Sequence, residues 1–176
     1  MLEQTQPYSV IHRRDDIEYR LYPAATFAQV RVCGPYTMRL NSGFRELSHY
    51  VTGGNAQQRA MPIVAPVCMQ ACTHDESHVR MYLGAHSRVH DLPTPLSDAV
   101  ELTTTAPVYV AALMLSDLFN QTSMASAALR LRRALDDARI TYHAIPEYRY
   151  YTSPWQQLGR RGDVVYRLTH PPYLFM

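Results

Sequence analysis

Apolar residues recur along this chain with two different periods. In two stretches they fall at i, i+4, i+7 and i+11, which places them on one stripe of an amphipathic helix. The stripe of the first predicted helix, residues 36–51, consists of Leu40, Phe44, Leu47 and Val51. The stripe of the second consists of Met124, Ala128, Leu131 and Leu135. We therefore expect two long helices, one in each half of the chain.

Strand-type residues surround both predicted helices. Gly34-Pro35 precedes the first helix, and Gly53-Gly54 is expected to end it. We expect strands, in chain order, at 8–22, 25–33, 61–72, 78–84, a pair within 99–115, 142–151 and 163–168, with a loop over 85–98. Each half then reads strand, strand, helix, strand, strand or a close variant. This weak repeat predicts an α+β fold in which two halves share a curved sheet or distorted barrel, with a ligand cleft between helix and sheet.

The composition indicates one soluble domain, residues 1–176, with an apolar content of 47%. The net charge of +2 is not concentrated in a block, which argues against nucleic-acid binding as the main role. No stretch approaches the roughly 18 apolar residues of a membrane span. An odd set of cysteines, Cys33, Cys68 and Cys72, and a start without the features of a secretory signal predict a cytoplasmic protein.

All 17 basic residues are arginine, so the chain is free of lysine. This excludes a lysine Schiff base and a phosphate-loop lysine. A GC-rich genome is a sufficient cause of the bias. Its consequence is that any acidic ligand must be held by guanidinium groups, which favour planar, bidentate contacts with carboxylate or phosphate.

The first predicted helix carries a second stripe, opposite the apolar one. It consists of Met38, Ser42, Arg45 and His49. A thioether, a guanidinium and an imidazole at one-turn spacing are groups that a metalloporphyrin uses, with imidazole for iron and guanidinium for propionate. A solvated helix face carries the same residue types, so the pattern alone leaves both interpretations open.

Other candidate chemistry is weaker. Cys68, Cys72, His74 and His78 could gather on a hairpin, but their spacing matches none of the common structural zinc patterns. No Gly-x-Ser-x-Gly elbow is present, and no cysteine has a base beside it that the sequence identifies.

The segment with the most recognisable sequence features is residues 151–168, YTSPWQQLGRRGDVVYRL. A turn at Ser153-Pro154 leads to a basic turn with Arg160 and Arg161, which feeds into an aromatic strand. This segment is similar to the end of the SOUL or heme-binding protein family. The resemblance continues in IEYRLYPAATFAQV at 17–30, GFRELSHYVTGGN at 43–55 and MPIVAPV at 61–67, and it covers about residues 8–168. Residues 169–176 form a tail beyond it.

The resemblance implies a distorted antiparallel β-barrel of two pseudo-repeats flanked by two long helices, as in effector-binding domains. It also implies reversible binding of heme or a related tetrapyrrole, as carrier or buffer, in a shallow apolar cleft beside the first helix. The implied binding residues are Met38, Ser42, Arg45 and His49, with Arg160 and Arg161 as further partners of propionates. Leu21 stands where some relatives have a histidine proposed as an iron ligand. His49 or a tyrosine would then serve, or the iron would stay unligated.

Two alternatives belong to other functional classes. The fold resembles that of effector-binding proteins, some relatives of which hydrolyse small electrophiles. Glu147, Tyr148 or Tyr150 would then be catalytic groups, although an edge-strand carboxylate is a simpler interpretation of Glu147. The third hypothesis is an interaction protein in a stress or death pathway, as proposed for some members of the family. No residue supports it separately.

Overall fold

Both helices form where the apolar stripes predict them. The computed structural model describes residues 4–84, 89–116, 121–152 and 161–172. Helix α1 spans Tyr36–Val51 and helix α2 spans Gln121–Asp137. The predicted glycine stop after α1 is confirmed: Gly53 adopts a φ of +114°, which favours glycine, and the amide of Gly54 donates to the carbonyl of His49 over 2.8 Å.

The strands agree with the prediction in order and differ from it at several ends. They are β1 (Gln4–Thr5), β2 (Ser9–Arg14), β3 (Ile17–Tyr22), β4 (Ala25–Cys33), β5 (Val64–Ala71), β6 (Glu76–Gly84), β7 (Val100–Thr105), β8 (Val108–Ser116), β9 (Glu147–Tyr150) and β10 (Arg161–Arg167).

Two predicted strands were wrong in extent. The segment 8–22 is a hairpin of β2 and β3, because Asp15 turns the chain with a φ of 54°, a conformation that aspartate tolerates. The strand expected at 142–151 shrinks to β9, which starts directly after Pro146. Tyr142 forms only an isolated bridge to Leu168. Within the expected loop 85–98, Val89–Asp91 is a short 3₁₀ turn.

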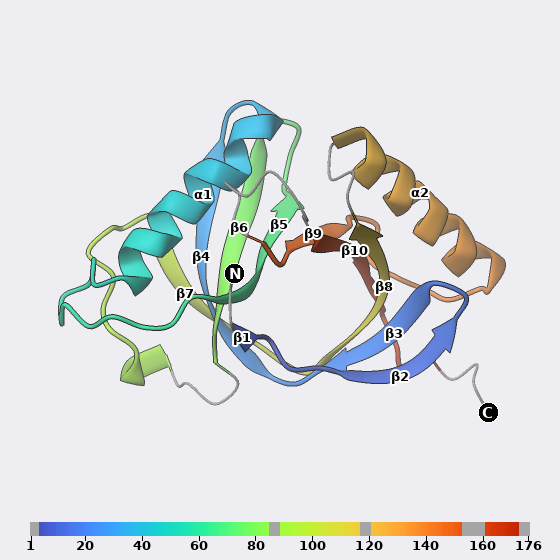
Figure 1. Ribbon diagram of the computed structural model, residues 1–176, viewed down its shortest axis with the longest axis horizontal. Helices are drawn as coiled ribbons and strands as arrows, with labels where there is room; N and C mark the ends of the chain where they lie inside the picture. The colour runs from blue at the N-terminus through green and yellow to red at the C-terminus, as the bar shows by residue number, and fades with distance from the viewer. Residues whose placement is uncertain (1–3, 85–88, 117–120, 153–160, 173–176) are drawn as a thin grey trace.

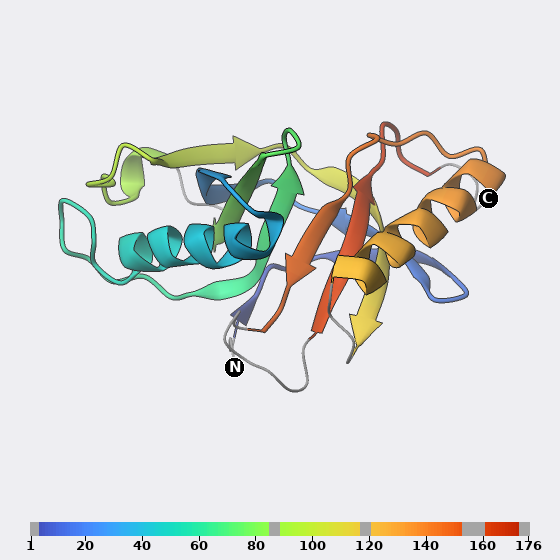
Figure 2. The same ribbon diagram turned by 90° about the horizontal axis from the view of Figure 1, so that it is seen from above.

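The sheet has the order β2-β3-β8-β10-β9-β5-β6-β4-β7, and β1 pairs in parallel with β5. All neighbours along the main path are antiparallel. The predicted repeat is visible in this order: β5, β6, β4 and α1 on one side of the centre correspond to β9, β10, β8 and α2 on the other. The sheet curls into a half-barrel, and both helices lie on its outer side (Figures 1 and 2). The α+β, barrel-like expectation is confirmed.

Strand alternation separates an apolar outer face from an inner face that combines charged residues with smaller apolar clusters. The side chains that face α1 include Val30, Met69, Val79 and Met81, packed with Leu47 in one core cluster. The helix approaches β6 so closely at Gly43 that an added Cβ would lie 2.5 Å from the Cβ of Val79. A second cluster, which includes Leu113, Leu131, Leu135 and Val164, lies under α2.

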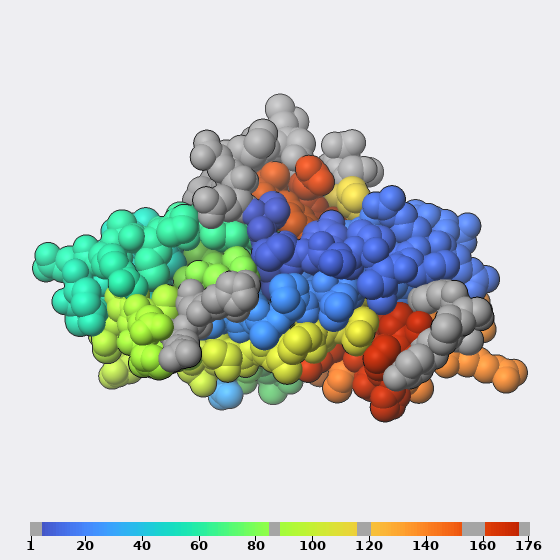
Figure 3. All heavy atoms as spheres, turned by 90° about the horizontal axis from the view of Figure 1, so that it is seen from below, coloured from blue at the N-terminus to red at the C-terminus, as the bar shows by residue number. Residues whose placement is uncertain are grey.

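The ligand cleft that the sequence analysis expected between helix and sheet is therefore filled by core side chains, and that expectation is wrong. A cavity lies instead on the inner face of the sheet. Seen from below, the N-terminal strands cover part of this side of the molecule, beside the segment that contains β7 and β8 (Figure 3). Neither of the described helices is both long enough and apolar enough to cross a bilayer.

Candidate functional site

The second stripe of α1 lies on the outward face of the helix. Its opposite face, with Phe44 and Leu47, is buried against the sheet. Met38 is 61% exposed, Arg45 and His49 are exposed, and Ser42 is half-buried. The structure thus brings the four predicted residues together on one surface, and none of them lines the cavity on the inner face of the sheet.

His49 occupies a defined position at the end of this stripe. A Cβ added to Gly54 would lie 2.3 Å from both Nδ1 and Cε1 of the imidazole, so this edge of the ring rests against the glycine. Arg45 precedes His49 by one helical turn. The imidazole is therefore exposed and held by its local backbone, with a guanidinium on the same face.

The other sequence-predicted binding residues lie elsewhere. Arg161 is the exposed first residue of β10, in the half of the sheet that α2 covers, and Arg160 falls outside the described residues. Leu21 is half-buried on β3, opposite Ser9 and Tyr109.

A shallow depression of about 430 Å³ lies at the start of α1. It is lined by Gly34, Pro35, Tyr36, Arg39, His74 and Asp75. Its arginine is already engaged: the Arg39 guanidinium donates to the carbonyls of Gly34 and His74 and to the Ser77 hydroxyl. The Arg39 guanidinium is therefore buried, with three of its donor groups already bound to the protein.

The cysteines and histidines of β5 and β6 are dispersed. Cys68 is buried, and the His74 side chain is 98% exposed. Burial raises the pKa of the Cys68 thiol to about 12, so it stays neutral at physiological pH. In residues 4–84, 89–116, 121–152 and 161–172 no group of three or more His, Cys, Asp or Glu is placed to hold a metal ion.

The inner face of the sheet carries a row of polar residues across its centre. The register places Arg80 of β6 opposite Cys68 of β5, Cys68 opposite Arg149 of β9, and Arg149 opposite Asp163 of β10. Glu147 precedes Arg149 by two positions, so both side chains point to the same face. Three strands from both halves of the chain, β6, β9 and β10, thus place charged residues at the pseudo-symmetric centre, and β5 contributes the neutral Cys68 between them.

The two carboxylate oxygens of Glu147 pair with different arginines. Its Oε1 accepts from Arg149 Nε over 2.8 Å, and its Oε2 pairs with Arg80 Nη2. Glu147 is only 5% exposed and Arg149 only 4%. Burial alone would raise the pKa of Glu147, but the guanidiniums of Arg80 and Arg149 lower it to about 2. The carboxylate is therefore ionised and has little capacity to accept a further proton near neutral pH.

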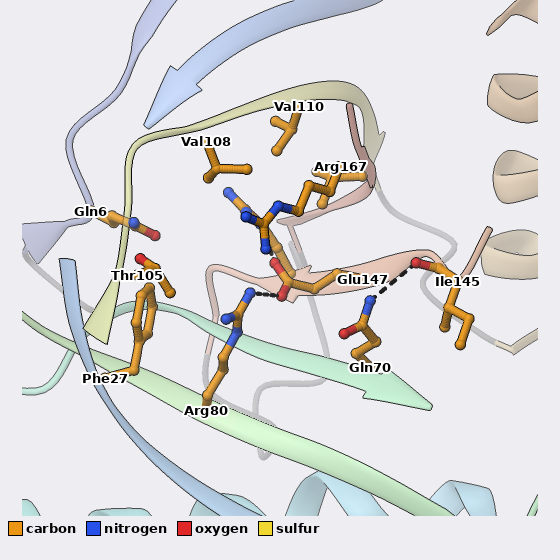
Figure 4. Close-up of a pocket in the computed structure, with 12 residues that line it drawn as sticks. Gln6, Phe27, Gln70, Arg80, Thr105, Val108, Val110, Ile145, Glu147 and Arg167 are labelled. Carbon is orange, nitrogen blue, oxygen red and sulfur yellow. Dashed lines mark hydrogen bonds and ion pairs between the residues drawn. The ribbon is translucent and has the colours of Figure 1, made fainter. Parts of the chain in front are cut away.

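A cavity of about 100 Å³ opens beside this carboxylate. Its lining comprises Gln6, Phe27, Gln70, Arg80, Thr105, Val108, Val110, Ile145, Glu147, Arg149, Val165 and Arg167. Figure 4 shows the side chains of Arg80, Glu147 and Arg167 pointing into the same space. Two buried polar atoms of the lining have no hydrogen-bond partner among the described residues, Arg149 Nη1 and Gln6 Oε1.

A second charged network adjoins the cavity. Arg20 pairs with Asp163 and donates from Nε to Glu18 over 2.7 Å. The hydroxyl of Tyr151 donates to Asp163 over 2.9 Å, and Arg13 pairs with Glu18 at 2.9 Å. Two arginines and two carboxylates balance one another here.

The three residues considered as catalytic groups do not come together. Glu147 lies on the inner face, whereas Tyr148 and Tyr150 alternate to the outer face; the Tyr150 hydroxyl contacts Met124 Sδ of α2 at 3.8 Å. Sequence reasoning singled out Glu147 but placed it on an edge strand, and β9 is central. It missed Arg80 and Arg149. The sequence did contain an indication of these two residues, because each arginine lies between apolar or aromatic residues of a predicted strand. An arginine that is buried with such neighbours needs a charged partner.

Comparisons with known proteins place these observations in context. The model of the SOUL heme-binding protein family matches residues 3–167. A comparison with curated proteins found no similar sequence.

Solved structures with the same fold share little sequence with the chain. The C-terminal domain of EcmrR superposes with a TM-score of 0.63 at 8% identity, covering 93% of this chain and 99% of that one. A hydrolase from Listeria innocua has a TM-score of 0.56 at 10% identity, covering 90% and 93%. EcmrR in a complex with DNA gives 0.66 at 8% identity, covering 86% of this chain and 57% of that one. At these identities the likeness is one of fold.

Proposed function

The chain belongs to the SOUL heme-binding protein family, and from this premise we propose that it reversibly binds heme or a related tetrapyrrole as a carrier or buffer. The family supports the ligand class. The residues of this chain that would hold the ligand are inferred from their own placement, and the exposed imidazole of His49 carries the argument.

The outer stripe of α1 offers the groups that such a ligand needs. The Nδ1–Cε1 edge of His49 rests against Gly54 on an exposed face, which leaves the imidazole available as an iron ligand. The Arg45 guanidinium, one turn away, suits a propionate, and Met38 adds exposed apolar surface. Ser42 contributes a hydroxyl between them. Bound heme would supply the iron that the imidazole coordinates.

The inner cavity does not fit the macrocycle. Its volume of about 100 Å³ is well below the roughly 300–1,000 Å³ of pockets that enclose drug-sized ligands. A tetrapyrrole on the outer face of α1 would keep one of its own faces in water, so the buried apolar area is limited. Limited burial is compatible with ready release, which a carrier or buffer requires.

Hydrolysis through Glu147 gains no support from the geometry. A general base works best with a pKa near the operating pH, and both oxygens of Glu147 are engaged by Arg80 and Arg149. No specific observation favours a role in a stress or death pathway either. A cytoplasmic location remains part of the proposal, supported by three free cysteines.

Titration with hemin tests the proposal, with metal-free protoporphyrin as a companion ligand. We expect the Soret band to saturate near one equivalent. His49→Ala should weaken hemin by about tenfold or more and leave protoporphyrin unchanged, whereas Arg45→Ala should weaken both. Arg161 lies in the other half of the sheet, so Arg161→Ala should leave both affinities unchanged if the ligand binds on α1.

Two exposed residues remote from α1 provide matched controls, His143→Ala for the imidazole and Arg133→Ala for the guanidinium. Neither should alter the titration. Failure to saturate near one equivalent, or unchanged affinity in the combined His49→Ala and Arg45→Ala variant, would contradict tetrapyrrole binding on this face.

A further inference from the structure

The inner cavity has an excess of positive charge. Three arginines line it, Arg80, Arg149 and Arg167, against the single carboxylate of Glu147. Arg167 is exposed at the end of β10 and makes no ion pair with a described residue. The adjoining network of Arg13, Arg20, Glu18 and Asp163 is balanced and cannot neutralise this excess. The cavity therefore favours a negatively charged occupant.

Two of its polar groups are buried without a partner. Arg149 is 4% exposed, and its Nη1 donates to no described group, although its Nε is bound to Glu147. Gln6 is also 4% exposed, and its Oε1 accepts from no described group. Buried polar atoms in folded proteins are normally hydrogen-bonded, so an unpaired guanidinium donor on a residue of the cavity wall favours an occupant that accepts hydrogen bonds.

Part of the remaining wall is apolar. Phe27, Val108, Val110 and Val165 contribute carbon surface to the lining, and Figure 4 shows Phe27, Val108 and Val110 around the charged groups. The Arg80 guanidinium lies 4.9 Å from the centre of the Phe27 ring, so the apolar and the cationic parts of the wall meet. An occupant that satisfies both parts carries an acidic group at one end and a compact hydrocarbon body at the other.

We propose that the inner cavity binds a small organic carboxylate with an aromatic or branched apolar body. Arg149 Nη1 and Arg167 hold the carboxylate, and the valines and Phe27 enclose the body. Its size separates this site from the tetrapyrrole surface of α1, since about 100 Å³ admits a single small ring and excludes a macrocycle. The site does not depend on tetrapyrrole binding.

A charge series of three ligands of nearly equal shape tests the site: benzoate, benzamide and benzamidine. Isothermal titration of the full chain, with amide chemical shifts to locate the contact, gives the affinities. We expect one benzoate per chain, with shifts centred on β9 and β10. Benzamide should bind about tenfold more weakly, and benzamidine should not bind measurably.

Variants locate the site without disturbing the buried cluster. Arg167→Gln, at an exposed position, should weaken benzoate about tenfold, and Val108→Phe should block it by filling the cavity. Arg133→Gln on α2 is the matched arginine control, and His49→Ala should leave benzoate affinity unchanged. Equal or stronger binding of benzamidine, or benzoate affinity that neither Arg167→Gln nor Val108→Phe alters, would overturn the proposal. Loss of hemin binding alone would leave it intact.

Discussion

Arg149 donates from Nε to Glu147 Oε1 over 2.8 Å, while Nη1 of the same guanidinium has no partner in the described part of the chain. The other carboxylate oxygen is bound to Arg80. One carboxylate thus neutralises part of two cations at the centre of the sheet. The arrangement links stability to the proposed binding, because the pairing that joins β6 to β9 includes Arg80, Glu147 and Arg149, which all line the cavity.

Removing the charge of Glu147 should destabilise the protein strongly. Glu147→Gln leaves the buried Arg149 and the half-buried Arg80 without a countercharge, and breaking a buried ion pair in this way costs about 3–5 kcal/mol. The free energy of unfolding from urea titration at pH 7 measures the loss. Glu101→Gln, at an exposed strand position, is the control and should change stability by less than about 0.5 kcal/mol. A Glu147→Gln loss as small as that of the control would contradict the assigned pairing.

The stabilisation by Glu147 should disappear in acid. Its pKa is about 2 in the folded protein against an ordinary 4.5, so its contribution is complete above about pH 4.5 and is lost as the pH falls through about 2. The shift corresponds to about 3 kcal/mol. The stability difference between wild type and Glu147→Gln should therefore shrink steadily from pH 5 to pH 2. Glu18, whose pKa is also lowered, is present in both proteins and cancels. A constant difference over this range would be inconsistent with the lowered pKa.

Substitutions at the neighbouring pair of Arg20 and Asp163 should also destabilise the protein, and the loss should grow with the number of contacts removed. Tyr151→Phe removes one hydrogen bond to the carboxylate of Asp163 and should cost about 1.5–3 kcal/mol. Asp163→Asn removes the buried countercharge of Arg20 and leaves it only the pair with Glu18, and should cost about 3–5 kcal/mol. Urea unfolding of both variants checks the order. Phenylalanine keeps the ring and removes only the hydroxyl, so a loss for Tyr151→Phe as large as that for Asp163→Asn would contradict the leading role assigned to the Arg20–Asp163 pair.

Close packing of α1 on the sheet should make Gly43 intolerant of a side chain. Alanine favours a helix over glycine by about 1 kcal/mol, but its Cβ would lie 2.5 Å from the Cβ of Val79, and overpacking of this kind costs about 1–3 kcal/mol. We expect net destabilisation in thermal or urea unfolding. Asn41→Ala, exposed in the same helix, should instead stabilise slightly. Stabilisation by Gly43→Ala would mean that the helix can move away from β6 at little cost.

These features differ in how far the sequence alone could predict them. Helix α1 was predicted at its observed ends because Gly34-Pro35, the apolar stripe and Gly53-Gly54 are all local signals. The hairpin at Asp15 was missed because strand-type residues continue on both sides of the turn. The turn depends on the positive φ of Asp15, which the sequence does not show. The repeat in the sequence was sufficient to predict a curled sheet. It did not predict on which face of the sheet the cavity lies, because that depends on how the strands pair in register.

The charged centre shows why register matters. Arg80 and Glu147 are 67 positions apart, and only the pairing of β6 with β5 and of β5 with β9 brings them together. Periodicity along one strand could show that Arg80 and its neighbours alternate in polarity. It could not show which carboxylate would lie opposite. The outer stripe of α1, by contrast, is set by one helix, and its four residues were grouped correctly from their spacing.

The contact between the His49 imidazole and Gly54 allows a direct test of whether the imidazole binds heme. A Cβ at Gly54 would come within 2.3 Å of Nδ1 and Cε1 of the imidazole and 2.6 Å of the His49 carbonyl oxygen, so Gly54→Ala must displace the ring. We expect hemin affinity in this variant to fall toward that of His49→Ala. In a His49→Ala background the same change should have no further effect on affinity, which a double-mutant cycle measures.

Gly53→Ala separates this effect from damage to the helix end. Gly53 has a φ of +114°, and the nearest atom to an added Cβ is the carbonyl oxygen of Gln58 at 3.6 Å, with no contact to His49. Alanine there should cost about 1 kcal/mol of stability through backbone strain while leaving the imidazole in place. Hemin affinity should then stay at the wild-type value. An equal loss of affinity in Gly53→Ala and Gly54→Ala would assign the effect to the end of α1 as a whole and would remove the imidazole from the binding mechanism.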